Sequence, residues 1–148
     1  MKKQLLFFTL CFLPAIFLQV NSYAQTSKPY TEGPVWQVQF VKTKSGMGQL
    51  YLKNLSEGWI KMMTAAKQQG LITDYKILVG EPSSQNDWDL MLLYQVKNYA
   101  ALDGMSNKMD ALAQQMFGNE DTQHQAAVSR NDLRELYGGK MMQELIFK

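Results

Sequence analysis

The stretch from residue 74 to residue 96 constrains the fold of this chain more than any other. Two runs of β-branched, aromatic and aliphatic residues flank a polar segment, residues 81–87, which holds a proline, two serines and an Asn-Asp pair. This pattern is typical of a β-hairpin with a longer loop. The chain before it predicts a strand and then a helix, and the chain after it predicts a helix and then a strand.

The N-terminus has the three parts of a secretory signal peptide. Lys2 and Lys3 precede an apolar run interrupted by Pro14, and small residues follow it up to Ala24. We therefore predict that residues 1–24 are a cleaved leader and that the protein is exported, to a bacterial periplasm or outside the cell. The run is shorter than the roughly 20 apolar residues of a membrane span, so we expect no stable membrane insertion after cleavage. A retained N-terminal anchor is the alternative.

Cleavage of the leader changes the charge and the cysteine content. It removes Lys2, Lys3 and the single cysteine, Cys11, which leaves 13 basic and 13 acidic residues. A chain without a basic excess is a poor match for nucleic acid or anionic membrane surfaces. A chain without cysteine forms no disulfide and no thiolate metal site. We expect residues 25–34 to be a flexible N-terminal segment and residues 35–148 to form one domain.

Residues 35–42 alternate between apolar and polar side chains. Trp36, Val38 and Phe40 fall on one face, and Gln37 and Gln39 fall on the other. This period of two predicts a strand. Glutamines on a strand usually face solvent; if that face is covered instead, the two amides become hydrogen-bonding groups that line a cavity.

Two amphipathic helices follow from the apolar spacing. The first is expected between Leu52 and Ala66 and ends at Gly70. The second has a stripe of leucines and methionines, with Asn98 as its N-cap and Gly118 as its end. The methionines could suggest a haem or copper site, but core filling is the better interpretation of a face that must be buried. Residues 119–137 predict one or two short helices. Gly138 and Gly139 then break the chain before a last strand over residues 141–147.

The order strand, helix, hairpin, helix, strand predicts a ferredoxin-like α+β fold. Its four-stranded antiparallel sheet carries both helices on one face. The other face is left bare and is expected to be apolar, partly through Leu90, Leu92, Leu93, Ile77 and Val79 of the hairpin. We therefore expect a second copy to cover it and to close a dimeric α/β barrel.

Several motifs resemble those of a known superfamily. In the first half they are Gly46-Met47-Gly48-x-x-Tyr51-Leu52, Trp59, Ala66, Gly70-Leu71-Ile72 and Tyr75. In the second half they are Trp88-Asp89-Leu90, Tyr99-Ala100-Ala101-Leu102-Asp103 and Leu133-Arg134-Glu135 before Gly138-Gly139. Together they resemble the dimeric α/β-barrel proteins, which include the NIPSNAP, EthD and antibiotic-biosynthesis-monooxygenase groups. The resemblance implies a homodimer with a cavity between sheet and helices. Members use that cavity for cofactor-free oxidation, haem handling, isomerisation or no known reaction, so the fold leaves the activity open.

The reactive residues narrow the choice of chemistry. With one histidine and no mature cysteine, a Cys-His nucleophile is excluded, and we predict neither a metal site nor a resident cofactor. His124 is interpreted as a surface residue; a general base or an axial haem ligand is the alternative. Arg134 and Glu135 are interpreted as a surface or dimer-contact pair. Polar residues on predicted strands are either exposed at sheet edges or converge on a small-molecule site. The candidate ligand-binding residues are Gln37, Gln39, Tyr94, His124 and Glu144.

Three functions agree with these patterns. The first is binding of a small apolar or aromatic molecule inside the barrel. The second is a cofactor-free monooxygenase-like enzyme. The third is a structural or interaction protein whose interior is filled by its own side chains. A cavity of several hundred Å³ with Gln37, Gln39 or Tyr94 pointing into it would favour the first two over the third.

Overall fold

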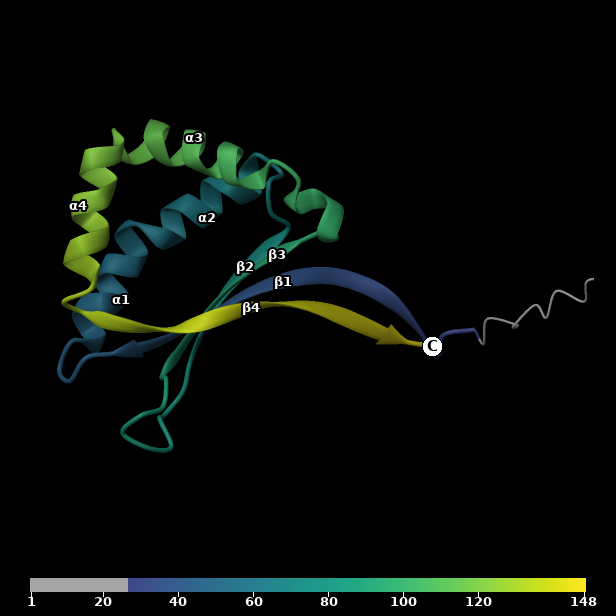
Figure 1. The fold of residues 1–148 in the computed structure, drawn as a ribbon, viewed down its shortest axis with the longest axis horizontal. Coiled ribbons are helices and arrows are strands. Elements are labelled where there is room, and N and C mark those ends of the chain that lie inside the picture. The colour runs from purple at the N-terminus through teal and green to yellow at the C-terminus, as the bar shows by residue number, and fades with distance from the viewer. Residues whose placement is uncertain (1–26) are drawn as a thin grey trace, which may run out of the picture.

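A four-stranded antiparallel sheet organises the structure, a computed structural model that describes residues 27–148. The strand order is β2-β3-β1-β4, and the helices lie on one side of the sheet (Figure 1). The architecture is therefore α+β and compatible with a ferredoxin-like fold, as the sequence predicts. The predicted leader, residues 1–24, lies outside the described residues. The strands are β1 (Tyr30–Thr43), β2 (Asp74–Val79), β3 (Leu90–Val96) and β4 (Arg134–Phe147).

The helical segment before the hairpin is divided, where the sequence predicts one helix. It forms α1 (Gly48–Glu57) and α2 (Trp59–Gln68), which meet at Gly58. Glycine is a weak helix former, so the break falls where the helix is least stable. The predicted end at Gly70 is confirmed. Gly70 has a φ of +70°, and the N–H of Leu71 donates to the carbonyl of Ala66 at 2.9 Å, as in a Schellman motif.

Three helical elements follow the hairpin. They are a short 3-10 helix, η1 (Tyr99–Leu102), then α3 (Met105–Phe117) and α4 (Glu120–Arg130). Asn98 is an N-cap as predicted, although it caps η1 and not the long helix: its side-chain oxygen accepts from the N–H of Ala101 at 3.0 Å. Gly118 ends α3 with a positive φ of 91°. α4 then descends from the end of α3 towards the start of β4 (Figure 1).

The outer parts of β1 and β4 extend further than the apolar pattern predicts. β1 begins at Tyr30, inside the segment expected to be flexible, and β4 begins at Arg134, before the glycine pair. The two strands stabilise each other, since Tyr30 pairs with Phe147 and their ring centroids lie 5.9 Å apart. Gly138 and Gly139 do not end the strand. They lie at a register shift opposite β1, where a bulge absorbs an extra residue.

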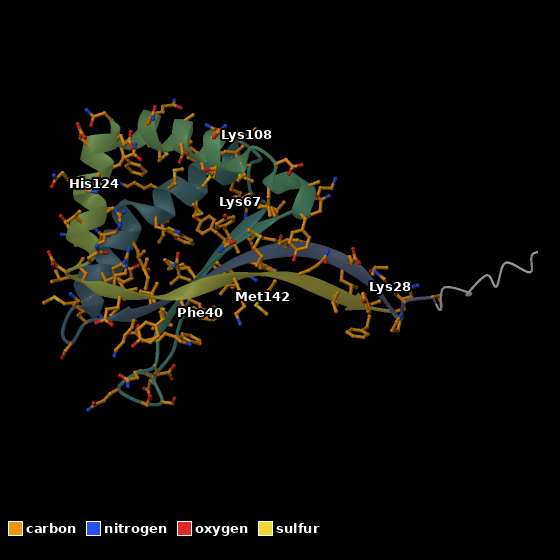
Figure 2. The ribbon with its side chains drawn as sticks, viewed as in Figure 1. Lys28, Phe40, Lys67, Lys108, His124 and Met142 are labelled. Carbon is orange, nitrogen blue, oxygen red and sulfur yellow. The ribbon has the colours of Figure 1, made fainter. Side chains whose placement is uncertain are left out.

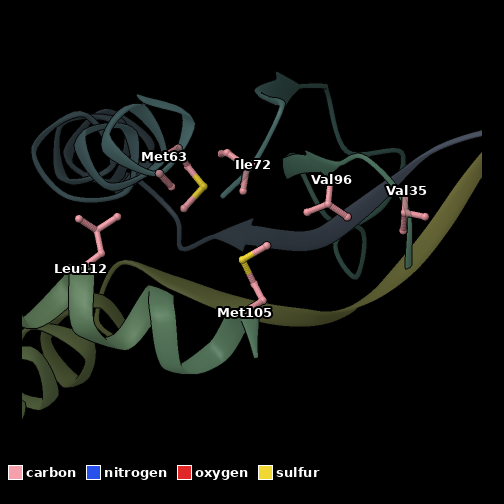
Figure 3. Close-up of a cluster of buried hydrophobic side chains, with 7 residues drawn as sticks. Val35, Met63, Ile72, Val96, Met105 and Leu112 are labelled. Atoms are coloured by element: carbon pink, nitrogen blue, oxygen red, sulfur yellow. The ribbon is translucent and has the colours of Figure 1, made fainter. Parts of the chain in front are cut away.

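Two groups of buried side chains hold the helices on the sheet. One cluster of buried side chains extends from Val35 of β1 to Met63 of α2 and to Met105 and Leu112 of α3 (Figure 3). Val41, at the other end of β1, packs in a second cluster with Tyr51 of α1. The interpretation of the α3 methionines as core residues is therefore confirmed. The two clusters leave the middle of β1 between them.

The side of the sheet away from the helices, called the open face below, is apolar. Trp36, Val38 and Phe40 of β1 lie on it, and Phe40 and Met142 point away from the helices (Figure 2). The hairpin contributes less to this face than expected. Leu93 lies on it, whereas Leu90 and Leu92 are buried under the helices, and Ile77 and Val79, which pair with Leu92 and Leu90, lie on that same helix-covered side. Two lysines lie over its aromatic rings: the Nζ atom of Lys76 is 4.9 Å from the Trp36 ring centroid and that of Lys140 is 5.6 Å from the Phe40 centroid. Val38 is buried within this face. The apolar residues on it that are partly or fully exposed are Trp36, Phe40, Leu78, Met91, Leu93, Met142 and Ile146.

Candidate functional site

A cavity of about 600 Å³ lies between the helix-covered face of the sheet and the helices above it. Its floor is formed by β1 and β3, and its walls by α1, α2, α3 and α4. The start of β4 closes one end. The helices line the cavity partly with small residues, Gly58, Ala113 and Ala126. Larger residues at these positions would fill part of its volume. α4 has no fully buried residue, because the side that faces the sheet lines the cavity and does not pack in the core.

The apolar part of the cavity comes from several elements. Trp59 lies at the start of α2. Its ring lies edge-on to that of Tyr75, with the ring centroids 5.8 Å apart. Leu92 lies on β3, and Phe117 is the last residue of α3. Large aromatic and aliphatic side chains around a volume of this size are typical of small-molecule sites, which measure about 300–1,000 Å³.

Gln37, Gln39 and Tyr94 lie on the floor of the cavity. All three are half-buried and line it. Gln37 pairs directly with Tyr94 across β1 and β3, so their side chains lie on the same face. Within residues 27–148 none of the three side chains makes a hydrogen bond to another protein group. Burial raises the pKa of the Tyr94 hydroxyl, so Tyr94 keeps its proton and can donate a hydrogen bond.

One end of the cavity is basic. Arg130 lies in the last turn of α4 and Arg134 is the first residue of β4, and both line the cavity. The Nη1 atom of Arg134 donates to the side-chain oxygen of Asn131 at 3.1 Å, whereas its buried Nε atom has no hydrogen-bond partner among residues 27–148. Arg134 is therefore half-buried in the lining of the cavity, where the sequence predicts a surface or dimer-contact residue.

Tyr51 is buried beside the arginines. Burial raises the pKa of its hydroxyl, and the positive charges of Arg134 and Arg130 partly oppose this shift. Burial, and then the charge of Arg134, lowers the pKa of Arg130. Arginine nevertheless stays charged, because its ordinary pKa lies far above neutral pH. Two like charges therefore share one partly buried corner of the cavity.

The remaining candidate residues lie away from this site. His124 is exposed on α4 and is not among the lining residues (Figure 2). Glu144 is on the open face, across the sheet from the cavity, where its Oε2 atom accepts from the Trp36 indole N–H at 3.4 Å. The structure thus brings together three of the five candidates, Gln37, Gln39 and Tyr94.

Several lining residues carry signals that the sequence analysis did not use. Thr122, Ala126 and Arg130 are four residues apart, which places them on one face of α4, and Gln123 lies beside them. Asn54 lies one turn after the buried Tyr51 on α1. The helical period of α4 could have identified its cavity side, but the identity of the surface opposite it depends on the tertiary fold.

Other sites are weaker. A depression of about 350 Å³ near the hairpin includes Asp89, whose carboxylate already accepts from the backbone N–H and the hydroxyl of Thr43.

Within the described residues, no three His, Cys, Asp or Glu side chains are close enough together to hold a metal ion. No helix in this part of the chain is long and apolar enough to cross a membrane. No protein-family model, curated protein or solved structure matches the chain.

Proposed function

We propose that this protein binds a small molecule with an apolar or aromatic body in the cavity between sheet and helices. One observation carries the proposal: a cavity of about 600 Å³ combines apolar walls with Gln37, Gln39 and Tyr94, whose side chains make no hydrogen bond to another group of residues 27–148. A mostly apolar site with a few convergent polar groups is the usual form of a ligand pocket. Gln37 and Gln39 would orient the ligand through their amides, and Trp59 would contact its body.

The two alternative functions have less support. A non-catalytic protein with a filled interior does not account for the open volume. A cofactor-free monooxygenase needs a group that removes a proton from the substrate. His124 lies outside the cavity, and the one carboxylate in its lining, that of Glu57, is exposed. Binding is therefore the function that we propose, and oxygen consumption with a phenolic compound would favour the enzyme instead.

Filling the cavity should weaken binding of a neutral aromatic probe. Ala113→Phe places a ring into the cavity from α3, and we expect it to weaken binding of N-phenyl-1-naphthylamine by about tenfold or more, since a clash in the pocket opposes the ligand directly. Fluorescence titration of the probe measures the dissociation constant.

The matched control is Ala111→Phe, on the exposed side of the same helix. We expect its affinity to equal that of the wild type. Equal affinity in both variants, or no binding by the wild type, would contradict the proposal. Circular dichroism melting of each variant separates a loss of the site from a loss of the fold.

We also propose that the protein is a homodimer whose two open faces cover each other, as in the dimeric α/β-barrel proteins that the sequence resembles. Support comes from the exposure of Leu78, Met142 and Ile146, which are each about half exposed, at 49–51%. Monomeric proteins seldom leave large contiguous apolar patches in water. Sedimentation equilibrium of the purified protein tests the proposed dimer.

Export is proposed from the N-terminal sequence alone. We expect native mass spectrometry of the protein collected outside the cytoplasm to give a subunit that begins at Gln25, because signal peptidase cuts after small residues such as Ala24. The same spectrum reports the subunit number and any retained ligand. A subunit that retains residues 1–24 would contradict cleavage.

A further inference from the structure

We propose that Arg130 and Arg134 form an anion-binding subsite, so that the ligand of this cavity is an amphipathic organic anion with an apolar body and one acidic head group, such as a carboxylate or sulfonate. The inference rests on the proposed binding function and names the chemical class of its ligand. It concerns the end of the cavity where α4 turns into β4.

The two guanidinium groups are held at this end by the fold. Arg130 is in the last turn of α4, and the turn of residues 131–133 brings Arg134 back beside it at the start of β4. Both are half-buried and both line the cavity. Arginine presents its N–H groups in a planar fork that suits carboxylate, sulfonate and phosphate oxygens. Two guanidinium groups at one corner of the cavity therefore favour the binding of a carboxylate, sulfonate or phosphate group there.

Among residues 27–148, no acidic side chain forms an ion pair with Arg130 or Arg134. The ion pairs in this part of the chain are Lys28–Glu32 and Lys67–Asp74. The Nε–H of Arg134 is buried without an acceptor, which is costly unless something else supplies one. The lining includes one acidic residue, Glu57, and its exposed side chain is at the end of α1. A bound anion would provide both the missing charge and the missing acceptor.

The rest of the cavity selects against a small inorganic anion as the full ligand. Beyond the arginines the walls are apolar, with Trp59, Leu92 and Phe117 among them. A free phosphate would leave this surface in contact with water, whereas an aromatic or aliphatic body would cover it. The cavity thus matches a molecule whose charged group and apolar body lie at opposite ends.

A pair of probes with the same rings separates the two parts of this idea. N-phenyl-1-naphthylamine is neutral, and 8-anilinonaphthalene-1-sulfonate adds a sulfonate to the same ring system. We expect the wild-type protein to bind the anionic probe about tenfold more tightly, because a charge-assisted hydrogen bond in a partly buried site is stronger than a neutral one. Arg130→Gln and Arg134→Gln should each remove most of this preference, and they should change the affinity for the neutral probe much less than the affinity for the anionic probe.

Two further variants control for charge and for folding. Lys108→Gln removes one positive charge from the exposed side of α3, outside the cavity (Figure 2), and should leave the preference intact. Arg130→Lys keeps the charge and should retain part of the preference. If Arg134→Gln fails to fold, Arg130→Gln still decides the matter.

The outcomes distinguish this inference from the function on which it rests. Wild-type protein that binds both probes equally, or arginine variants that keep the preference, would overturn the anion subsite and leave small-molecule binding intact. Arginine variants that fold but lose affinity for both probes alike would assign the arginines a structural role and overturn the subsite. Failure of the wild type to bind even the neutral probe would contradict the proposed function itself.

Discussion

Met142→Glu is expected to convert the proposed dimer into folded monomers, with the dimer dissociation constant raised at least about 100-fold. Burying an unpaired carboxylate at an interface costs about 3 kcal/mol, and 1.4 kcal/mol corresponds to a factor of about ten. Met142 suits the test because it lies on the open face and is half exposed in the single subunit. The charge is therefore compatible with the fold of the monomer. Sedimentation equilibrium measures the change.

Tyr99→Glu is the matched control. Tyr99 is 48% exposed on η1, outside the open face, so a carboxylate there should leave the dimer unaffected. If wild-type protein sediments as a single subunit at micromolar concentration, or if both variants remain dimeric, then the open face is not the subunit interface.

Gly139→Ala is expected to lower the free energy of unfolding by about 3 kcal/mol, in the range found for overpacked sites. A Cβ atom at Gly139 would lie 2.5 Å from the backbone carbonyl oxygen of Val38, and a backbone atom cannot move aside as a flexible side chain can. The substitution would push β4 away from β1 at the bulge between Leu136 and Gly139. Urea unfolding at one fixed protein concentration measures the loss.

Gly80→Ala provides the comparison for this substitution. Gly80 begins the hairpin loop, and a Cβ atom there would meet nothing within 4 Å. The free energy of unfolding of the Gly80→Ala variant should stay within about 0.5 kcal/mol of that of the wild type. Equal effects at the two glycines would show that the contact between β4 and Val38 does not constrain the fold.

Local sequence signals were sufficient for much of the fold. Alternation in β1, the spacing of Met105 and Leu112, and glycines past the ends of helices each depend on a few neighbouring residues. They predicted the α+β class, the hairpin and the core role of the methionines. What depends on partners far apart in the chain was less predictable. Tyr30 extends β1 only because Phe147 is opposite it.

The candidate site shows the same division. Gln37 and Gln39 were identified by their alternation, but whether they face water or a cavity depends on which side of the sheet the helices cover. The sequence predicts Arg134 to be a surface or dimer-contact residue, whereas the fold places it, half-buried, in the lining of the cavity. The sequence shows that Arg130 shares one face of α4 with Thr122 and Ala126. It does not show that this face lies opposite a cavity.

The indole N–H signals of the three tryptophans offer the most direct test of binding in the cavity. Trp59 lines the cavity, Trp36 lies on the open face, and Trp88 packs against Phe40 with ring centroids 5.0 Å apart. In a heteronuclear NMR titration with N-phenyl-1-naphthylamine, we expect the Trp59 signal to shift progressively to saturation while those of Trp36 and Trp88 stay in place. A shift of Trp36 or Trp88 with Trp59 unmoved, or no shift at all, would contradict a ligand site between the sheet and the helices.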